Sequence, residues 1–275
     1  MEQQAVFIQV GALADGFAPD NNTLPASTEL AGRSFQLQDA ADAVCTLSFG
    51  NDGSLTLHHA GRDAEYVIHA PCRVSSLRDS LYFVDCLPAQ PAGSSLSLVL
   101  DLARGLYTRV DGQLPDEAAT RLDPFRRVAQ GLELTAVSVA ISHGTVDHAA
   151  KPGEELHHAT RELIGMRNQY RYSRTECYEH IYLNDNFYAW QCLQGVEQGL
   201  ADVDRCHYIK LAEQLYLFVW REKIIPTLGV VLIDLARGKT DGKIVGYQGG
   251  DFGSLSNFAV GASARVLNTT RHVLD

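Results

Sequence analysis

The pentapeptide Asp101-Leu102-Ala103-Arg104-Gly105 occurs a second time as Asp234-Leu235-Ala236-Arg237-Gly238, 133 residues later. Other landmarks recur in the same order at that offset or at one residue more: Gly32 and Gly165, Asn51 and Asn184, Cys72 and Cys206, and Leu81 and Leu215. An ordered series of matches at one period is the signature of a structural repeat. We therefore expect two copies of one supersecondary pattern, with the pentapeptide forming a turn at the end of a strand.

The length also favours two domains. At 275 residues the chain exceeds the usual domain size of about 100–150 residues. We assign residues 1–150 to an N-terminal domain and residues 151–275 to a C-terminal domain. Glycine and proline punctuate residues 1–29, at positions such as Gly11 and Pro25, which predicts an extended arm that could plug a cavity mouth.

Composition excludes several classes of function. The chain has 33 acidic and 23 basic residues and a net charge of −10, so most of its surface would repel nucleic acid. It has neither a run of about 18 apolar residues nor a secretory signal pattern, so we expect no membrane partner and a cytoplasmic location. The six cysteines include no Cys-x-x-Cys pair and are expected to be reduced thiols.

Short apolar runs with a period of two begin after Gly32 and predict a mainly β protein with few short helices. In the second copy they give eight strands, at about residues 167–173, 177–183, 187–193, 204–211, 214–222, 228–235, 242–248 and 258–266. Eight short antiparallel strands close most economically into a small barrel, and two stacked sheets are the alternative. Helices are expected at residues 119–128 and 154–164, as connector and lid.

The two copies differ in the residues they direct inward. Alternation along residues 44–49 turns Cys45, Leu47 and Phe49 inward in the first copy. The equivalent positions of the second copy are Tyr178, His180 and Tyr182. Other inward positions change in the same way: Leu37 to Tyr170, Leu55 to Tyr188, Leu57 to Trp190, Val74 to Tyr208 and Ala70 to Asp204, with Tyr172 next in register after Tyr170. An apolar lining has been replaced by a polar aromatic one.

This replacement requires a physical reason. A buried hydroxyl or imidazole without a partner costs about 1–3 kcal/mol. Taken singly, Tyr170, Tyr188 and Tyr208 are typical of core residues whose hydroxyl groups reach solvent. As a set with a histidine between two tyrosines, they indicate a cavity that meets water or a small ligand.

The strand at residues 215–223 is apolar on both faces, so its pattern does not decide which residues point inward. If Tyr216, Phe218 and Trp220 face the interior, Glu222 is the carboxylate nearest the barrel mouth, where it could act as a base or orient His180. In the opposite orientation Arg221 takes that place as an anion clamp. Both residues are equally typical of a solvated charge run.

Motifs for metals and nucleotides are missing. Cys206 and His207 point to opposite faces of one strand and cannot easily share an ion, and a site through His180, Asp204 and Cys192 is disfavoured. The glycine-rich residues 246–253 lack the lysine of a phosphate-binding loop. We expect neither a metal nor an organic cofactor.

Several stretches together resemble the MoaF-like family, which is labelled molybdenum cofactor biosynthesis protein F: Tyr178-Glu179-His180-Ile181-Tyr182, residues 204–208, residues 220–227, Gly246-Tyr247, residues 10–19 and Leu24-Pro25. The resemblance spans nearly the whole chain. It implies lipocalin-like (calycin) barrels, and hence two tandem lipocalin-like antiparallel β-barrels related by internal duplication. The same barrel class includes ligand carriers, decarboxylases and cyclases that work without cofactors, so fold alone does not select a function.

The leading hypothesis is a cofactor-independent lyase, isomerase or cyclase acting on an aromatic or conjugated carbonyl or acid in the C-terminal barrel. His180 would transfer the proton, and Tyr178 and Tyr182 would hydrogen-bond the oxygen that gains charge. Glu222 or Asp204 would orient the imidazole. The remaining candidates would bind substrate: Trp190, Tyr170, Tyr172, Tyr208, Arg221 and Trp220.

Two other classes of function stay open. One is a carrier or sensor that binds a small hydrophobic or aromatic molecule and returns it unchanged. The other is an accessory of molybdenum cofactor biosynthesis that works through protein contacts. A homodimer is compatible with either, because the sequence does not determine the oligomeric state.

Overall fold

The computed structural model describes residues 6–18, 21–39, 43–60, 65–250 and 252–273. Contacts divide the chain into two compact units, each containing one β-barrel. The first barrel's unit comprises residues 24–113 and 139–158, and the second barrel's unit comprises residues 1–23, 114–138 and 159–275. The amino-terminal arm and the 114–138 connector therefore belong with the C-terminal barrel, which departs from a simple division at residue 150.

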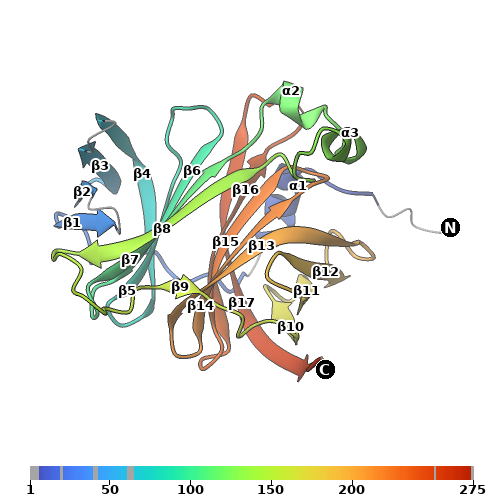
Figure 1. Ribbon diagram of the computed structural model, residues 1–275. Helices are drawn as coiled ribbons and strands as arrows, with labels where there is room; N and C mark the ends of the chain where they lie inside the picture. The colour runs from blue at the N-terminus through green and yellow to red at the C-terminus, as the bar shows by residue number, and fades with distance from the viewer. Residues whose placement is uncertain (1–5, 19–20, 40–42, 61–64, 251, 274–275) are drawn as a thin grey trace. The chain divides into compact units, whose positions relative to one another are not determined.

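Eight antiparallel strands form the closed N-terminal barrel (Figure 1). They are β1 (Ser34–Asp39), β2 (Val44–Phe49), β3 (Ser54–Ala60), β4 (Glu65–Arg78), β5 (Leu81–Cys86), β6 (Ser94–Asp101), β7 (Leu106–Gln113) and β8 (Ser138–Val146). Each strand pairs with the next along the chain, and β1 pairs with β8 to close the barrel.

The C-terminal barrel also has eight antiparallel strands, as the sequence predicted. They are β10 (Met166–Arg171), β11 (Cys177–Tyr182), β12 (Phe187–Gln194), β13 (Ala201–Ala212), β14 (Leu215–Glu222), β15 (Thr227–Asp234), β16 (Lys239–Tyr247) and β17 (Leu255–Thr269). The pairings β10–β17 and β12–β13 close the barrel, so the alternative of two stacked sheets is wrong. A two-residue strand, β9 (His158–Ala159), lies at the edge beside β13.

Strand registers confirm the internal duplication. Leu47 pairs with Leu57 in the first barrel, and the equivalent pair in the second is His180 with Trp190. Val74 pairs with Val84, and the equivalent pair is Tyr208 with Phe218. Because register determines which side chains share a face, the inward positions of one barrel correspond to those of the other.

The repeated pentapeptide forms the same turn in both barrels. The carboxylate of Asp101 accepts a hydrogen bond from the backbone N–H of Arg104 at 3.1 Å, and the equivalent bond from Arg237 to Asp234 is 3.0 Å. The final glycine has a φ of 67° in one copy and 58° in the other, a left-handed conformation that glycine adopts without strain. The pentapeptide therefore ends β6 and β15 and starts the next strand of each hairpin.

The helices differ in part from the prediction. Helices α2 (Glu117–Thr120) and α3 (Pro124–Ala129) lie in the region expected to be helical. No helix forms at residues 154–164, which the structure describes throughout. Positive φ angles at Gly153 and Gly165 bound that segment, and the Thr160 N–H donates to the Tyr208 carbonyl at 3.0 Å, so it follows the barrel as non-helical chain.

The amino-terminal arm is not extended but contains helix α1 (Val10–Phe17), which packs against β16 and β17 (Figure 1). Val10, Leu13 and Phe17 are buried and lie on one helical face. The helix has eight residues and no side-chain N-cap, so packing against the barrel stabilises it more than intrinsic propensity does.

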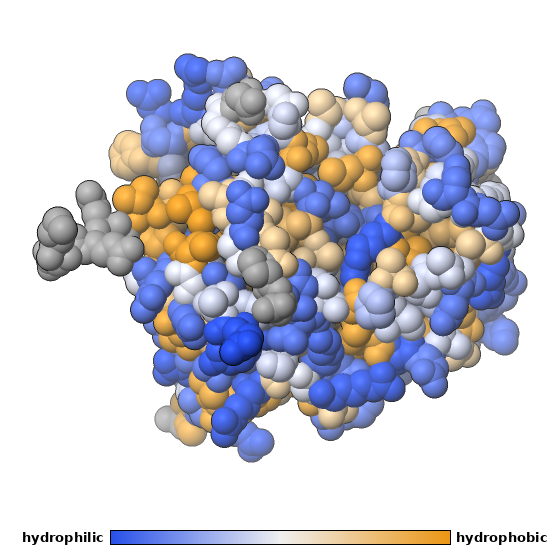
Figure 2. Space-filling model, turned by 180° about the vertical axis from the view of Figure 1, so that it is seen from behind, coloured by the Kyte–Doolittle hydropathy of each residue, from blue (hydrophilic) through white to orange (hydrophobic). Residues whose placement is uncertain are grey.

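Each barrel has its own core. The N-terminal core is mainly aliphatic, with Leu37, Leu47 and Leu57 almost inaccessible, whereas the C-terminal core is mainly aromatic. On the face shown in Figure 2, hydrophilic and hydrophobic residues are interspersed. Among the described residues, none of the helices is long and apolar enough to cross a membrane.

Candidate functional site

Aromatic rings fill most of the C-terminal barrel and leave a cavity of about 30 Å³ beside α1. A volume of this size holds water-sized molecules rather than an organic ligand while the helix is in place. The lining comes from α1, the barrel strands and one loop: Leu13, Phe17, Tyr172, Tyr178, His180, Tyr188, Trp190, Glu197, Trp220, Glu222 and Ile244. Helix α1 therefore forms part of the cavity wall through Leu13 and Phe17.

Alternation along β14 determines which of two charged residues reaches the cavity. Trp220 and Glu222 line it, so the inward set is Tyr216, Phe218 and Trp220. Arg221 points to the other face, where its guanidinium donates to the Glu133 carboxylate at 2.7 Å and to the Val137 carbonyl at 2.9 Å. The alternative in which Arg221 serves as an anion clamp in the cavity is therefore wrong.

His180, on β11, lies in the middle of the aromatic core. Its ring centroid is 4.8 Å from that of Tyr170, 5.1 Å from that of Tyr188 and 5.7 Å from that of Phe218. Burial lowers the pKa of its imidazole to about 3, so the ring is neutral at physiological pH. Its Nδ1 atom is buried and has no hydrogen-bond partner among the described residues.

Two glutamates line the same cavity. The carboxylate of Glu222 accepts a hydrogen bond from Trp220 Nε1 at 2.9 Å, and that of Glu197 accepts one from the Tyr178 hydroxyl at 3.0 Å. Burial raises the pKa of Glu222 well above its ordinary value of 4.5, and the nearby acidic groups Asp204 and Glu197 raise it further. Burial also raises the pKa of Glu197. Burial and these acidic neighbours therefore favour a protonated carboxyl group at Glu222.

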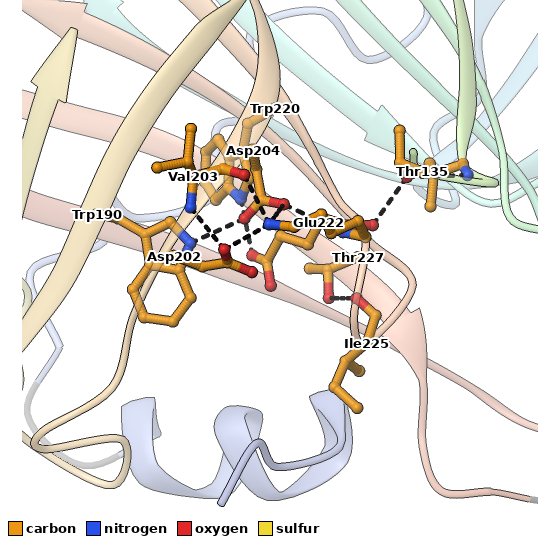
Figure 3. A network of polar contacts seen from close by, with 11 residues as sticks. Thr135, Trp190, Asp202, Val203, Asp204, Trp220, Glu222, Ile225 and Thr227 are labelled. Atoms are coloured by element: carbon orange, nitrogen blue, oxygen red, sulfur yellow. Dashed lines mark hydrogen bonds and ion pairs between the residues drawn. The ribbon is translucent and has the colours of Figure 1, made fainter. Parts of the chain in front are cut away.

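Asp204 does not line the cavity but forms a hydrogen bond with Trp190, which does. Its carboxylate accepts hydrogen bonds from Trp190 Nε1 at 2.9 Å and from the Lys223 backbone N–H at 3.1 Å. The Lys223 ammonium contacts both Asp202 and Asp204. Figure 3 shows this network beside Glu222 and Trp220. The one lysine of the network is thus engaged by these two aspartates.

The remaining tyrosines form hydrogen bonds within the core. The Tyr170 and Tyr182 hydroxyls are 2.6 Å apart, and Asn168 Nδ2 donates to the Tyr170 hydroxyl at 3.0 Å. The Tyr208 hydroxyl donates to the Phe187 carbonyl at 3.3 Å. These groups satisfy one another and do not line the cavity.

The structure therefore brings together about half of the site residues that the sequence predicted. The cavity is lined by Tyr172, Tyr178, His180, Trp190, Trp220 and Glu222. Five others lie outside its lining: Tyr170, Tyr182, Tyr208, Asp204 and Arg221. The three tyrosines face the barrel interior, but at a different level from the cavity. Alternation identifies the inward face of a strand and not the level at which a cavity lies.

Sequence reasoning left Leu13, Phe17, Glu197 and Ile244 out of the site. The spacing of Leu13 and Phe17 by four residues is a helical signal that could have predicted α1. Glu197 lies in a loop between β12 and β13, where no periodicity applies. Tyr188 was recognised as inward-facing and does line the cavity.

The described residues contain no group of three or more His, Cys, Asp or Glu side chains arranged to hold a metal ion. None of the six cysteines, all of which the structure describes, forms a disulfide bond. The chemistry available in the cavity is therefore that of a protonatable carboxyl group, a neutral imidazole, hydroxyl and indole donors, and aromatic faces.

Comparisons with known proteins agree with the two-barrel organisation. The model of the MoaF N-terminal domain matches residues 5–116, and that of the MoaF C-terminal domain matches residues 157–270. Protein MoaF from Klebsiella aerogenes is 56% identical over 275 residues, which are 99% of each chain.

Among solved structures, a protein from Burkholderia vietnamiensis described as a candidate beta-lactamase has 19% identity and a TM-score of 0.34. The match covers 39% of this chain and 100% of that one. A TM-score this low assigns neither fold nor function. On the two domain matches and the full-length relative, the chain belongs to the MoaF family.

Proposed function

We propose that the C-terminal barrel binds a small aromatic or conjugated molecule and moves a proton on it, as a cofactor-independent enzyme of the lyase or isomerase type. The observation that carries this proposal is a carboxyl group with a strongly raised pKa, that of Glu222, in a cavity walled by aromatic rings. Titratable groups with large pKa shifts in a cavity are typical of functional sites, although structural networks also produce them.

Glu222 suits proton transfer better than His180 does. An imidazole whose pKa is about 3 is a weak base, and near pH 7 it is not in the imidazolium form that acts as an acid. A carboxyl group whose pKa is raised by burial holds its proton more strongly than an ordinary glutamate and can both donate and recover it. We assign the proton to Glu222, and to His180 the role of orienting the ligand through its unpartnered Nδ1 atom.

Ligand entry requires movement of α1. The cavity of about 30 Å³ is too small for an aromatic ring, and Leu13 and Phe17 form part of its wall. Displacement of this short helix would open the space that those two side chains occupy. The helix would then exclude water again once the ligand is bound, which strengthens electrostatic interactions in the site.

The test compares Glu222→Gln with Glu213→Gln, whose side chain is 83% exposed on the turn between β13 and β14. Each variant is incubated in D₂O with a panel of phenolic acids, conjugated aldehydes and arylalkyl ketones, and products and deuterium incorporation are followed by NMR. Any turnover found for the wild type should fall by about 100-fold or more in Glu222→Gln and stay unchanged in Glu213→Gln. Equal turnover in all three proteins would refute the role of Glu222.

A carrier or sensor is the second candidate, because the aromatic walls of the cavity suit binding whether or not a reaction follows. A carrier would return its ligand unchanged after prolonged incubation, while the ligand raises the melting temperature. Product formation at any rate that depends on Glu222 would decide against a carrier.

The accessory role in molybdenum cofactor biosynthesis, which the family label suggests, would have to rest on protein contacts. A phosphorylated pterin carries negative charge, whereas the described residues that line the cavity include Glu197 and Glu222 and neither lysine nor arginine. A deletion strain that keeps full molybdoenzyme activity would exclude this role.

A further inference from the structure

The charges around the cavity are strongly unbalanced. Within the part of the chain that the structure describes, neither Glu197 nor Glu222 forms an ion pair with a basic side chain. The Lys223 ammonium group contacts Asp202 and Asp204. Of these four carboxyl groups, the two that face the cavity, Glu197 and Glu222, have no ion-pair partner among the described residues.

The walls of the cavity are suited to a cation. The faces and edges of Tyr172, Tyr178, Tyr188, Trp190 and Trp220 surround it. Aromatic faces attract cations through their quadrupole, and tryptophan does so most strongly. Aromatic rings combined with an unpaired carboxylate form a common recognition site for organic ammonium groups.

A second observation independently indicates a missing ligand. The Nδ1 atom of His180 is buried and unpartnered, in a residue that is 6% exposed and lines the cavity. A neutral imidazole keeps one nitrogen as a donor and one as an acceptor, so it can bind a polar group of the ligand in either tautomer. A buried polar atom of this kind calls for a hydrogen-bond partner, which either a water molecule or a polar group of a ligand in the cavity can supply.

We propose that the ligand of this cavity is an organic cation, a primary arylalkyl ammonium, whose charged group lies between Glu197 and Glu222 and whose ring packs against Trp190 and Trp220. This inference rests on the proposed small-molecule site and specifies its ligand class. It departs from the acid substrate that the sequence suggested, because an aryl carboxylate would bring a further negative charge to two glutamates.

Binding of such a cation should release a proton. Several titratable groups face Glu222: Asp202 and Asp204 from β13, Glu197 from the loop before it, Tyr188 from β12, and Lys223. Of the charges acting on Glu222 itself, the acidic ones favour its protonated form. An ammonium group at 3–4 Å would reverse that preference, so Glu222 would ionise as the ligand binds. A neutral ligand of the same shape would release no proton.

The experiment uses the full chain and three matched probes: benzylamine as the cation, benzyl alcohol as the neutral isostere and benzoate as the anion. The chain has two tryptophans, and both line the cavity, so tryptophan fluorescence, excited selectively over that of the 11 tyrosines, reports on this site. Titrations are run on the wild type, Glu222→Gln, Glu197→Gln and the control Glu213→Gln. Calorimetry in buffers of different ionisation enthalpy counts the protons released.

We expect benzylamine to bind about tenfold or more tightly than benzyl alcohol, and benzoate to bind weakest. Glu222→Gln should weaken benzylamine by about tenfold or more and change benzyl alcohol by less than about threefold. Glu213→Gln should change neither, and proton release should accompany benzylamine alone.

Two results would overturn the inference in different ways. Binding of benzyl alcohol or benzoate at least as tightly as benzylamine would refute the cation and leave the small-molecule site standing. Absence of any fluorescence change with all three probes would refute the small-molecule site itself.

Discussion

At the scale of single residues, burial determines the chemistry of this site more than residue type does. His180 and Glu222 line one cavity, and burial shifts both toward the neutral form: the histidine pKa falls to about 3 and the glutamate pKa rises well above 4.5. The residue that looked like the proton carrier in the sequence is thus a neutral ring. The Glu222 carboxyl group, which lines the same cavity, is the one whose protonated form burial favours.

Glu222→Gln should make the protein less sensitive to rising pH. Because the folded-state pKa of Glu222 is raised, its stabilising contribution is fully present below the unfolded value of about 4.5 and is lost as pH rises toward the folded value. The difference in melting temperature, variant minus wild type, should therefore increase with pH from about 4.5 upward. Parallel curves over this range would show that Glu222 is not protonated in the folded protein.

At the scale of elements, α1 and the repeated turn have separate roles. The turn after β6 and β15 fixes the path of two hairpins, and the same backbone geometry recurs in both copies. Helix α1 instead belongs to the unit of the C-terminal barrel, where it lines the cavity. One element is therefore part of the duplicated scaffold, and the other belongs to the site.

Phe17→Ala should loosen α1 without unfolding the barrel. The Phe17 ring lies 4.8 Å from Tyr172 and 5.6 Å from Tyr178 between centroids, so truncation removes the main contact of the helix with the cavity wall. The unfolding free energy should fall by less than the roughly 3–5 kcal/mol typical of a core Phe→Ala change. The reason is that α1 can detach locally while the barrel stays folded. Hydrogen exchange should speed up over residues 10–17, and the exposed Asp15→Ala should leave it unchanged. Equal protection in all proteins would contradict a movable cover.

Gly105→Ala and Gly238→Ala should each destabilise the protein by about 1–2 kcal/mol, because both positions require a positive φ. The cost should be larger at Gly105, where a Cβ would meet His148 Cε1 at 2.9 Å, than at Gly238, where it would meet the Ala264 carbonyl oxygen at 3.1 Å. Gly249→Ala, where a Cβ would meet nothing within 4 Å, is the control. Chemical denaturation measures all three, and a neutral Gly238→Ala would show that the two turns are not equivalent.

At the scale of the whole molecule, one barrel has an aliphatic interior and the other a polar aromatic one. The equivalent pairs Leu47–Leu57 and His180–Trp190 mark that division. We infer that the N-terminal barrel retains the structural role and that the C-terminal barrel carries the ligand.

Leu47→Ala should separate stability from binding. Leu47 is fully buried, so its truncation should cost about 2–5 kcal/mol of unfolding free energy. The fluorescence titration with benzylamine, which reports only on the C-terminal barrel, should be unchanged below the melting transition. A weakened titration at a temperature where the variant is folded would show that the first barrel takes part in binding.

Much of the fold could be predicted from the sequence, because alternation and the 133-residue offset are direct consequences of strand geometry. The β14 orientation could not, since Leu217 and Val219 on its other face are as buried as Phe218. The depth of Tyr170 and the position of Glu197 also depend on how strands tilt and loops fold, which a linear pattern does not encode. The strand pattern therefore predicted which residues face the barrel interior. Which of those residues line the cavity became clear only from the structure.

The most direct test is the titration of the Glu222 carboxyl carbon by NMR, assigned by its loss in Glu222→Gln and repeated with saturating benzylamine. We expect a midpoint well above the ordinary glutamate value of 4.5 in the free protein, and a lower midpoint with benzylamine bound. An ordinary midpoint in the free protein, or one that benzylamine does not move, would contradict the proposal that Glu222 is a half-buried acid which ionises when a cation binds.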